Sequence, residues 1–358
     1  MRFYRTTTEY NCGIDLHSRQ MYMCLMDHEG NKLVHTNVTG NDWDYFMSRI
    51  KPYRESLTVC CECTFNWYWL ADACAAEQIE FVLAHALYVK AIHGGKNKND
   101  QIDSEKLAHL LRSNLIPPAY VYPAEKRSVR DLLRRRTTFV WKRTELLHHL
   151  TCMPLVQGQQ PVKKCQHRVR ERWFEQLRPR FEQPMRKISA EADMYLIKEF
   201  DKIIDRLERV IVKETKREQG RDFALLKTIP GIGDILALTI LYEMDTVDRF
   251  PRVQDFSSCC RLVKGSAASA GKIKGLRGAK LGNPYLRWAF GEAAVIGKRS
   301  NRDLKRFGEQ LEAHNPKMVV NAILANKLAR SVYFMPKSAL KHGKGFDPKL
   351  FAKGIARG

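Results

Sequence analysis

The sequence predicts an α/β domain in residues 1–123, a long helical middle in 124–218, a mainly helical domain in 219–336 and a basic tail in 337–358. Short apolar runs alternate with helical patterns and turn signals in the first segment. The second segment is charged, poor in glycine and helical in its periodicity. The third contains an apolar helix that follows a glycine-rich turn. A chain of 358 residues is long for a single domain.

The first segment opens with three predicted strands, at residues 10–16, 20–26 and 32–38, and a turn signal at 27–31. The elements that follow are a helix at 42–50, a strand at 57–63, a helix at 67–78, a strand at 79–83 and helices at 85–92 and 100–113. An antiparallel meander followed by parallel strands joined through helices is the order of a ribonuclease-H-like domain. In that order the first and fourth strands are neighbours.

Four carboxylates stand out in this segment: Asp15, Glu62, Asp100 and Asp103. Neighbouring first and fourth strands would bring Asp15 and Glu62 together, and residues three apart share a helix face. Hard oxygen ligands of this kind suit Mg²⁺ (or Mn²⁺) in phosphodiester chemistry. The ordinary alternatives are a turn cap for Asp15 and a favourable helix dipole for the two helical aspartates. Glu62 is the hardest to explain that way, because a carboxylate in an apolar strand is costly without a positive partner.

The charge balance predicts polyanionic partners. Lysine and arginine number 61 against 39 acidic residues, the formal net charge is +22 and the sequence pI is about 9.6. Such a balance is typical of proteins that bind DNA or RNA. No apolar run reaches the ~20 residues that span a bilayer, and the first residues contain no apolar core of a secretory signal. The sequence therefore predicts a cytoplasmic protein that does not enter a membrane.

The ten cysteines show no spacing typical of a zinc site. Cys60, Cys61 and Cys63 flank Glu62 in one run, which we interpret as a buried strand whose thiols act as small hydrophobic groups. A reducing cytoplasm is the compartment that fits unpaired cysteines.

In the middle segment, apolar residues recur at a spacing of three and four: Ile197, Phe200, Ile204, Leu207 and Ile211. This spacing indicates a coiled-coil seam and predicts a dimer interface. The alternative is a single helix that packs within its own subunit, because the pattern lasts only two to three heptads.

In the third segment, TIPGIGDILALTIL places the turn Pro230-Gly231-Ile232-Gly233 before an apolar helix. This arrangement predicts a helix-hairpin-helix unit, in which the amides of Gly231 and Gly233 approach a phosphate at a helix N-terminus. Ordinary turn chemistry is the alternative.

Residues 264–283 are rich in Gly, Ser, Ala, Lys and Arg, which predicts a long loop. Ser269 lies in it among basic residues that would stabilise charge on a phosphate: Arg261, Lys264, Lys272, Lys274, Arg277 and Lys280. By composition alone, a loop serine that contacts backbone is the ordinary interpretation.

Taken together, these motifs resemble the insertion-sequence transposases of the DEDD type, a family of bridge-RNA-guided DNA recombinases. The amino-terminal resemblance is carried by GIDLH, the strand with Glu62 and KNDQIDSEKLAHLL. The carboxyl-terminal resemblance is carried by TIPGIGDILALTIL, Arg249-Phe250, the serine segment, GNPYLR at 282–287 and Lys327-Leu328. The resemblance covers nearly the whole chain.

The resemblance implies a composite site. A RuvC-like domain binds the metal through the four acids, and a carboxyl-terminal transposase domain contributes a serine that joins covalently to DNA; that serine corresponds to Ser269. The family commonly has glycine directly after the serine and Leu-x-Pro upstream. This chain has Ala270 there, and Leu262-Val263-Lys264 upstream. Ser266 therefore stays a second candidate.

The resemblance also implies a guide RNA that pairs with donor and target DNA. The seam predicts a dimer, and strand exchange between two DNA molecules predicts that dimers assemble into a tetramer, in the bacterial cytoplasm with the nucleoid. Nucleic-acid contacts are predicted for Lys96, Lys98, Arg134, Arg135, Arg136, Gly231, Gly233, Lys264, Lys272, Lys274, Arg277, Lys280 and Arg287, with Lys163-Lys164 as a further basic pair. A basic run is otherwise a solvated face.

Two other functions stay open. A metal-dependent Holliday-junction-type resolvase would cut with the four acids and would not use the serine. A non-enzymatic nucleic-acid scaffold would need neither the four acids nor the serine for catalysis.

Overall fold

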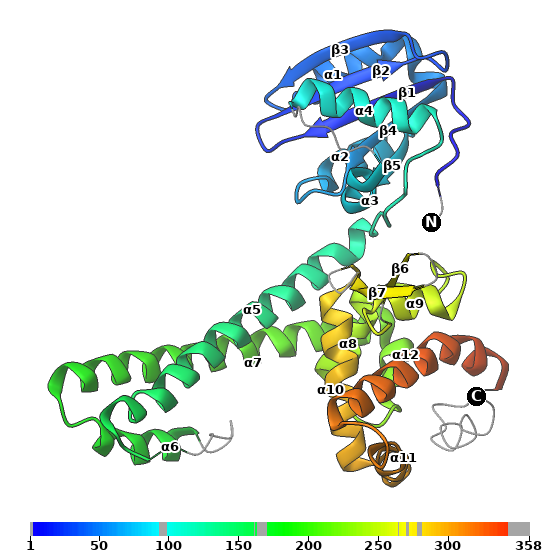
Figure 1. Cartoon of the computed structure of the whole chain (residues 1–358). Coiled ribbons are helices and arrows are strands. Elements are labelled where there is room, and N and C mark those ends of the chain that lie inside the picture. The colour runs from blue at the N-terminus through cyan, green and yellow to red at the C-terminus, as the bar shows by residue number, and fades with distance from the viewer. Residues whose placement is uncertain are drawn as a thin grey trace. The chain divides into compact units, whose positions relative to one another are not determined.

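The computed structural model describes residues 3–92, 99–160, 162, 170–263, 265–269, 272–277 and 281–342, with only the backbone described for 266–269, 272–277 and 336–342. The chain divides into two compact units, Met1–Glu125 and Lys126–Gly358 (Figure 1).

The first unit is built on a five-stranded sheet of order β3-β2-β1-β4-β5. Its strands are β1 (Tyr10–Leu16), β2 (Gln20–Met26), β3 (Lys32–Thr39), β4 (Leu57–Glu62) and β5 (Glu80–Ala84). β1, β2 and β3 pair antiparallel, whereas β4 is parallel to both β1 and β5. The predicted neighbours, the first and fourth strands, therefore lie side by side, and the mixed sheet is consistent with a ribonuclease-H-like fold.

Helices cover both faces of this sheet. On one face, Phe46 of α1 (Trp43–Ile50) and Leu70 of α2 (Tyr68–Ala76) pack with the side chains of Cys12 and Ile14. On the other face, α4 (Asp100–Arg112) lies across the sheet, and its leucines pack with Cys60 and residues of β5 and α3 (Ala86–Ile92) (Figure 1). The sequence predicts these helices; it misses the 3₁₀ helix η1 (Lys51–Ser56) that connects α1 to β4.

Cysteine side chains fill part of this core. Cys60 and Cys61 are fully buried in β4, as predicted for thiols that act as small hydrophobic groups. Burial raises the pKa of the Cys61 thiol well above its ordinary value. These thiols are therefore protonated and serve packing.

The second unit is mainly helical. Its described elements are α5 (Ala124–Cys152), the 3₁₀ helix η2 (Leu155–Gln157), α6 (Arg170–Leu177), the 3₁₀ helix η4 (Arg178–Arg180), α7 (Pro184–Lys227), α8 (Asp234–Met244), α9 (Val253–Cys259), β6 (Gly265–Ser269), β7 (Lys272–Arg277), α10 (Pro284–Ser300), α11 (Arg302–Glu312) and α12 (Lys317–His342). α7 runs across the predicted boundary at residue 218, with non-helical backbone at Gln219. α12 continues to His342, beyond the predicted start of the tail at Lys337.

α5 and α7 form an antiparallel helix pair (Figure 1). Three ion pairs connect them along their length: Arg136–Glu208 at 2.5 Å, Arg143–Asp201 at 2.5 Å and His149–Asp193 at 2.6 Å. As the α5 residue number rises, that of its α7 partner falls, which is the signature of antiparallel packing.

The predicted seam of α7 is used inside this pair. Ile197, Ile204 and Ile211 are buried, and Ile211 shares a core with Leu133 of α5. Phe200 contacts Phe139 of α5, with ring centroids 5.9 Å apart. The prediction that this seam is a dimer interface is therefore wrong; the seam packs within the chain, which is the alternative that two to three heptads leave open.

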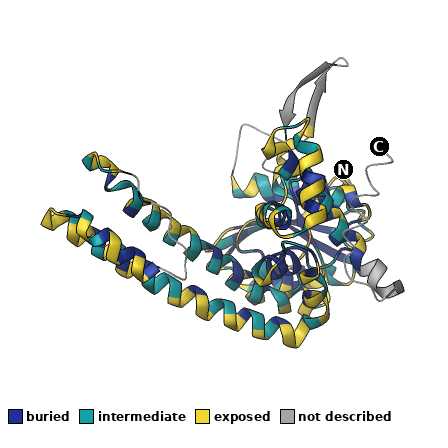
Figure 2. Cartoon of the chain, turned by 90° about the horizontal axis from the view of Figure 1, so that it is seen from below, coloured by how far each residue is buried: buried dark blue, intermediate teal, exposed yellow. Residues whose placement is uncertain are grey.

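A different set of apolar residues faces outward on α7: Met185, Ile188, Tyr195, Leu196, Ile203 and Val210 are all exposed. Figure 2 shows exposed residues along the outer faces of the long helices. Leu196, Ile203 and Val210 are seven residues apart, so they lie in one row along the helix.

The main core of the second unit surrounds α8, whose residues Leu236–Met244 are all buried. α10 and α12 pack around it through residues such as Phe290 and Leu328. The predicted apolar helix after the glycine turn is thus present as α8, and it lies in the core of this unit. Among the helices that the structure describes, none combines the length and hydropathy needed to cross a bilayer.

The predicted loop at 264–283 is wrong for two stretches. β6 and β7 pair antiparallel, with Gly265 opposite Arg277 at one end and Ser269 opposite Lys272 at the other. β6 (GSAAS) contains no large apolar residue, and Gly275 interrupts the alternation in β7 (KIKGLR), so the sequence pattern does not reveal this hairpin.

Candidate functional site

Asp15 is positioned by the close packing of β1 against α4. A Cβ atom on Gly13 would lie 2.3 Å from the backbone nitrogen of Ala108 and 2.3 Å from the carbonyl oxygen of Ser104. Only glycine permits this approach. Asp15 follows two residues later on the same face of β1, and the N-terminus of α4 comes close to it.

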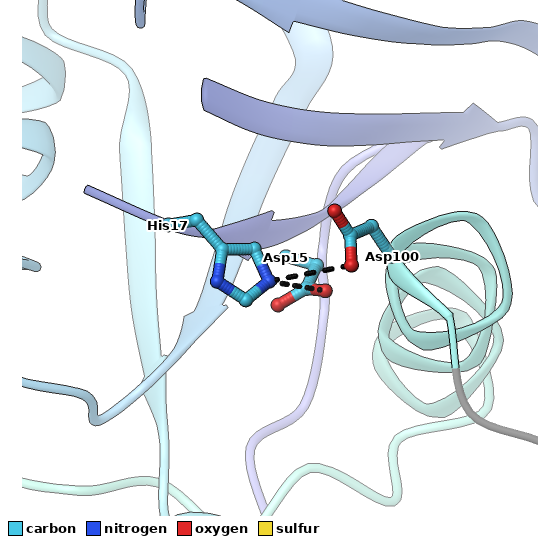
Figure 3. Close-up of side chains that lie close together, drawn as sticks. All are labelled: Asp15, His17 and Asp100. Atoms are coloured by element: carbon cyan, nitrogen blue, oxygen red, sulfur yellow. Dashed lines mark hydrogen bonds and ion pairs between the residues drawn. The ribbon is translucent and has the colours of Figure 1, made fainter. Parts of the chain in front are cut away.

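The carboxylates of Asp15 and Asp100 converge on one imidazole (Figure 3). Nε2 of His17 lies 3.2 Å from Oδ2 of Asp15 and 3.4 Å from Oδ1 of Asp100. One ligand atom from each of these residues lies within 4.8 Å of the other two. Residues 85 positions apart in the sequence therefore form one group that is able to hold a metal ion.

A second layer of hydrogen bonds orients Asp100. Nε2 of Gln20 donates to Oδ2 of Asp100 at 3.1 Å, and Nδ2 of Asn37 donates to Oε1 of Gln20 at 3.2 Å. At the start of α4, the side chain of Asn99 accepts a hydrogen bond from the amide of Ile102 at 2.7 Å and caps the helix. The position of Asp100 is thus set by both its helix and its side-chain partner.

Asp103 and Glu62 lie around this group. Asp103 is one helical turn beyond Asp100, and its Oδ1 is 3.2 Å from Nζ of Lys106. Glu62 ends β4, directly after Cys61, which pairs with Ile14 of β1. Asp15 and Glu62 therefore lie at the same edge of the sheet, although the carboxylates of Glu62 and Asp103 are outside the close group.

The surroundings of Asp15 disfavour its charge. Burial raises the pKa of Asp15 above its ordinary value, the nearby His17 lowers it, and the carboxylates of Asp100 and Asp103 raise it again. The net shift is upward. A bound cation would remove both the repulsion and the cost of burial, so this donor set fits a divalent ion that prefers carboxylate oxygens.

Two residues of this group were missed by sequence reasoning. His17 follows the strand by one residue, and Gln20 begins the next strand, so neither belongs to a carboxylate pattern. The only signal was position: His17 is two residues from Asp15 in GIDLH. Polar residues at the turn between two strands lie at the same sheet edge as the strand ends.

Two of the predicted nucleic-acid contacts already have partners. Arg134 donates from Nε and Nη2 to the buried carboxylate of Glu243, at 2.6 and 2.7 Å. Arg136 pairs with Glu208 of α7. Arg135 is exposed, with its guanidinium 4.7 Å from the ring centroid of Phe139, and Arg287 is exposed on α10. Nucleic-acid contacts by these arginines stay predictions.

Several other predicted contacts fall outside the described residues. Lys96, Lys98, Lys163, Lys164, Lys264 and Lys280 lie there entirely, and the side chains of Lys272, Lys274 and Arg277 are not described. The side-chain hydroxyls of Ser269 and Ser266 are also outside the described atoms. Their backbones are described: Ser269 pairs with Lys272, and Ser266 pairs with Leu276. Ser269 is therefore the last residue of β6, and Ser266 is the second.

The two glycines of the predicted phosphate turn differ in their surroundings. Gly231 has a φ of +89°, and a Cβ there would lie 2.3 Å from the carbonyl oxygen of Ala293 and 2.5 Å from the amide nitrogen of Gly297. Gly233 is exposed, caps α8 and has open space beside it. Gly231 is thus required for packing against α10, and the predicted phosphate contact is sterically open at Gly233.

Two sequence-family models match this chain. One, described as "Transposase" and named for the DEDD residues and IS110, matches residues 12–153, which include the four acids. The other, described as "Transposase IS116/IS110/IS902 family", matches residues 223–309, which include Ser269. No curated protein matches the chain. These two matched regions therefore carry IS110-family transposase domains, which support an insertion-sequence transposase that acts on DNA.

Proposed function

We propose that the chain is a DNA recombinase of an insertion sequence, which cuts and rejoins donor and target DNA through a covalent link between Ser269 and a DNA phosphate. The observation that carries the proposal is the convergence of Asp15 and Asp100 in a DEDD-type domain. The second transposase domain, which contains Ser269 on a hairpin, supports it further. Metal-site acids and a serine hairpin in one chain suit cutting that retains the DNA end.

The proposed metal site consists of Asp15, Glu62, Asp100 and Asp103. A divalent ion bound by these carboxylates (Mg²⁺ or Mn²⁺) supplies stabilisation of the negative charge that develops on the phosphate and on the leaving oxygen. Gln20 holds the carboxylate of Asp100 in its orientation. His17 contributes a further nitrogen at the same place.

In the proposed covalent step, one oxygen–phosphorus bond forms and one breaks, so the number of bonds to phosphorus stays the same. The hydroxyl oxygen of Ser269 attacks phosphorus, the new oxygen–phosphorus bond forms, and the bond from phosphorus to the 3′ oxygen breaks. The serine proton passes to solvent or a nearby base, and the 3′ oxygen leaves as a hydroxyl after taking up a proton. In the reverse step, a 3′ hydroxyl from the other DNA attacks the serine-linked phosphate and releases Ser269.

We also propose that a guide RNA selects the donor and target DNA by base pairing. The support is the charge of +22, since lysine and arginine bind phosphate backbones without reading sequence. Exposed Arg135, Arg287 and Gly233 are proposed contacts to these backbones. A cytoplasmic protein bound to the nucleoid fits such partners.

The proposed assembly is a dimer that pairs into a tetramer, because strand exchange joins two DNA molecules. The outward row of Leu196, Ile203 and Val210 on α7 replaces the buried seam as the proposed contact between subunits. Apolar rows of this kind, left exposed along a helix, favour association with a second helix.

The proposal is tested with DNA duplexes that carry the ends of the element, RNA transcribed from its non-coding end, and Mg²⁺. Wild-type protein is expected to form a covalent protein–DNA product and recombined DNA. Ser269→Ala is expected to lose both while it still binds DNA. A Holliday-junction-type resolvase would keep cutting with Ser269→Ala, so that result would contradict the proposal.

Glu62→Gln separates the enzyme from a scaffold. The recombinase is expected to lose recombination and keep binding, because the substitution removes the negative charge of a proposed metal ligand. Recombination that persists in Glu62→Gln would exclude the proposed metal site.

A further inference from the structure

We propose that Glu243, with Arg134 and Asn283, is a positioning group that fixes the base of the β6–β7 hairpin and thereby places Ser269. This inference rests on the proposed role of Ser269 as nucleophile. Its starting observation is a carboxylate in α8, whose residues Leu236–Met244 are all buried: the side chain of Glu243 is 2% exposed. A carboxylate at such a place is costly unless donors surround it.

Three donor atoms reach the carboxylate of Glu243. Arg134 of α5 binds both oxygens through Nε at 2.6 Å and Nη2 at 2.7 Å. Nδ2 of Asn283 donates to Oε2 at 2.6 Å. The guanidinium of Arg134 also lies 5.0 Å from the ring centroid of Tyr285, which stacks on Trp141 at an interplanar angle of 11°. A bidentate pair of this kind fixes both distance and orientation.

Asn283 holds the carboxyl-terminal end of the hairpin segment. Its Oδ1 accepts hydrogen bonds from the amides of Tyr285 at 2.8 Å and Leu286 at 3.1 Å, so it caps α10. Its own amide donates to the carbonyl of Cys259, at the end of α9, at 2.6 Å. Asn283 therefore connects Glu243 and the start of α10 through its side chain, and the end of α9 through its backbone amide.

The amino-terminal end of the segment is fixed at the same point. Nε of Arg261 donates to the carbonyl of Gly282 at 2.8 Å. Gly282 has a φ of +98°, and a Cβ there would lie 2.4 Å from the carbonyl oxygen of Cys259. The chain thus leaves α9 and returns to α10 through one contact region, which Asn283 links to Glu243.

This anchoring matters because the hairpin has only two strands. A two-stranded hairpin is marginally stable by itself, so the place of Ser269, at its far end, depends on how its base is held. A nucleophile must be placed to within a fraction of an ångström. Glu243 is therefore expected to act on the rate of attack and not on the binding of DNA.

The test measures covalent adduct formation per bound complex at saturating DNA, with full-length protein and the element-end duplexes described above. In Glu243→Gln, Arg134 and Asn283 compete for a single acceptor oxygen, and the rate is expected to fall ~100-fold, the effect of about 1 Å of misplacement. DNA affinity is expected to stay unchanged. Adduct formation at the wild-type rate would overturn the positioning role.

A rescue variant distinguishes positioning from general stability. In Glu243→Gln with Asn283→Asp, the glutamine donates to the new carboxylate and accepts from Arg134, while the carboxylate still caps α10. The adduct rate is expected to recover. A folded double variant that remains as slow as Glu243→Gln would contradict the proposal.

Asp245→Asn is the matched control. The side chain of Asp245, which follows the last residue of α8, is 3% exposed and pairs with Lys126 of α5 at 2.6 Å, so its loss also breaks an ion pair between α5 and the end of α8. Among the described hydrogen bonds of Arg261, Gly282 and Asn283, none is made with Asp245, and the adduct rate is expected to persist. If Asp245→Asn slows adduct formation as much as Glu243→Gln does, the effect of Glu243 would be a general loss of folding stability. That result would contradict the positioning role.

Ser269→Ala is measured in parallel. An adduct that survives this substitution, or a wild-type protein that forms none, would remove the proposed nucleophile, and the positioning role with it. An adduct that requires Ser269 but ignores Glu243→Gln would overturn the positioning role alone.

Discussion

Asp15 is held in surroundings that suit a bound cation better than an isolated carboxylate. Burial raises its pKa, and the nearby carboxylates of Asp100 and Asp103 raise it further. His17, which lies between Asp15 and Asp100, offsets part of this effect. A site of this kind costs stability until a cation binds, as binding sites often do.

The first prediction is that Asp15→Asn raises the melting temperature of the metal-free protein at neutral pH. The folded-state pKa of Asp15 lies above its ordinary value of 3.8. At a pH between these two values, the folded protein therefore holds a proton that the unfolded chain has released. Stability relative to the variant therefore falls as pH rises from 3.8 through the raised pKa, and levels off above it. Thermal melts in chelator from pH 4 to pH 8 measure this; a gap between variant and wild type that shrinks as pH rises would contradict it.

The second prediction concerns Mg²⁺. At a 100-fold excess over its dissociation constant, a ligand stabilises a folded protein by about 2.7 kcal/mol, so Mg²⁺ is expected to raise the melting temperature of the wild type. Asp15→Asn is expected to lose this shift. The control is Asp27→Asn, which is expected to keep the Mg²⁺ shift. Asp27 lies at a turn, where hydrogen bonds with Asn31 lower its pKa. An equal Mg²⁺ shift in Asp15→Asn would show that the ion binds elsewhere.

The residue scale also shows what sequence reasoning reached. The four acids were found because carboxylates at strand ends and in a first helical turn form a pattern. His17 was missed because one histidine carries no such pattern. Arg134 was interpreted as a surface cation because its partner, Glu243, lies 109 residues away in an apolar helix. No local pattern reveals a partner at that separation.

At the scale of elements, the close contact of β1 with α4 sets the geometry of the site. Gly13 allows the backbone of α4 to approach the strand, and α4 carries Asp100 in its first turn. The strands and helices themselves were predictable from alternation and periodicity. The sequence predicted the order of the strands but not the close contact between β1 and α4. That contact depends on the absence of a side chain at Gly13.

The third prediction separates the two glycines of the turn before α8. Gly231→Ala is expected to destabilise the protein by at least ~2 kcal/mol, because it combines a positive φ with a clash against the backbone of α10. Gly233→Ala, with open space beside it, is expected to cost less than about 1 kcal/mol. Urea unfolding measures both, and equal destabilisation would contradict the packing role of Gly231.

The fourth prediction uses neighbouring residues of α7. Ile203 is 39% exposed and Ile204 is 2% exposed. Ile203→Asp is expected to change stability by no more than ~0.5 kcal/mol, as surface substitutions do, and to dissociate the oligomer. Ile204→Asp buries a charge and is expected to unfold the α5–α7 pair.

Sedimentation of both variants, with and without RNA, checks this prediction. An Ile203→Asp protein that sediments with the wild type as an oligomer would exclude the outward row as the contact. The periodicity of α7 was read correctly from the sequence, but the two rows are both apolar. Which of the two rows is buried depends on how α5 packs against α7, and the sequence pattern does not predict that packing.

At the scale of the molecule, the proposed chemistry is divided between the two units. The acids lie in Met1–Glu125 and Ser269 lies in Lys126–Gly358. Each unit alone lacks a part that the proposed reaction needs. The charge of +22 is the property that would bring both units onto nucleic acid, and it was evident from composition. The hairpin that carries Ser269 was not, since β6 contains no large apolar residue and the alternation in β7 is interrupted.

The most direct measurement is the mass of the DNA-linked peptide. Wild-type protein is reacted with element-end DNA, guide RNA and Mg²⁺, the DNA is digested to nucleotides, and the protein is digested for mass spectrometry. The account predicts one peptide heavier by a nucleotide phosphate, with the added mass on Ser269. Recombined DNA without any linked peptide, or with the added mass on Ser266, would contradict it.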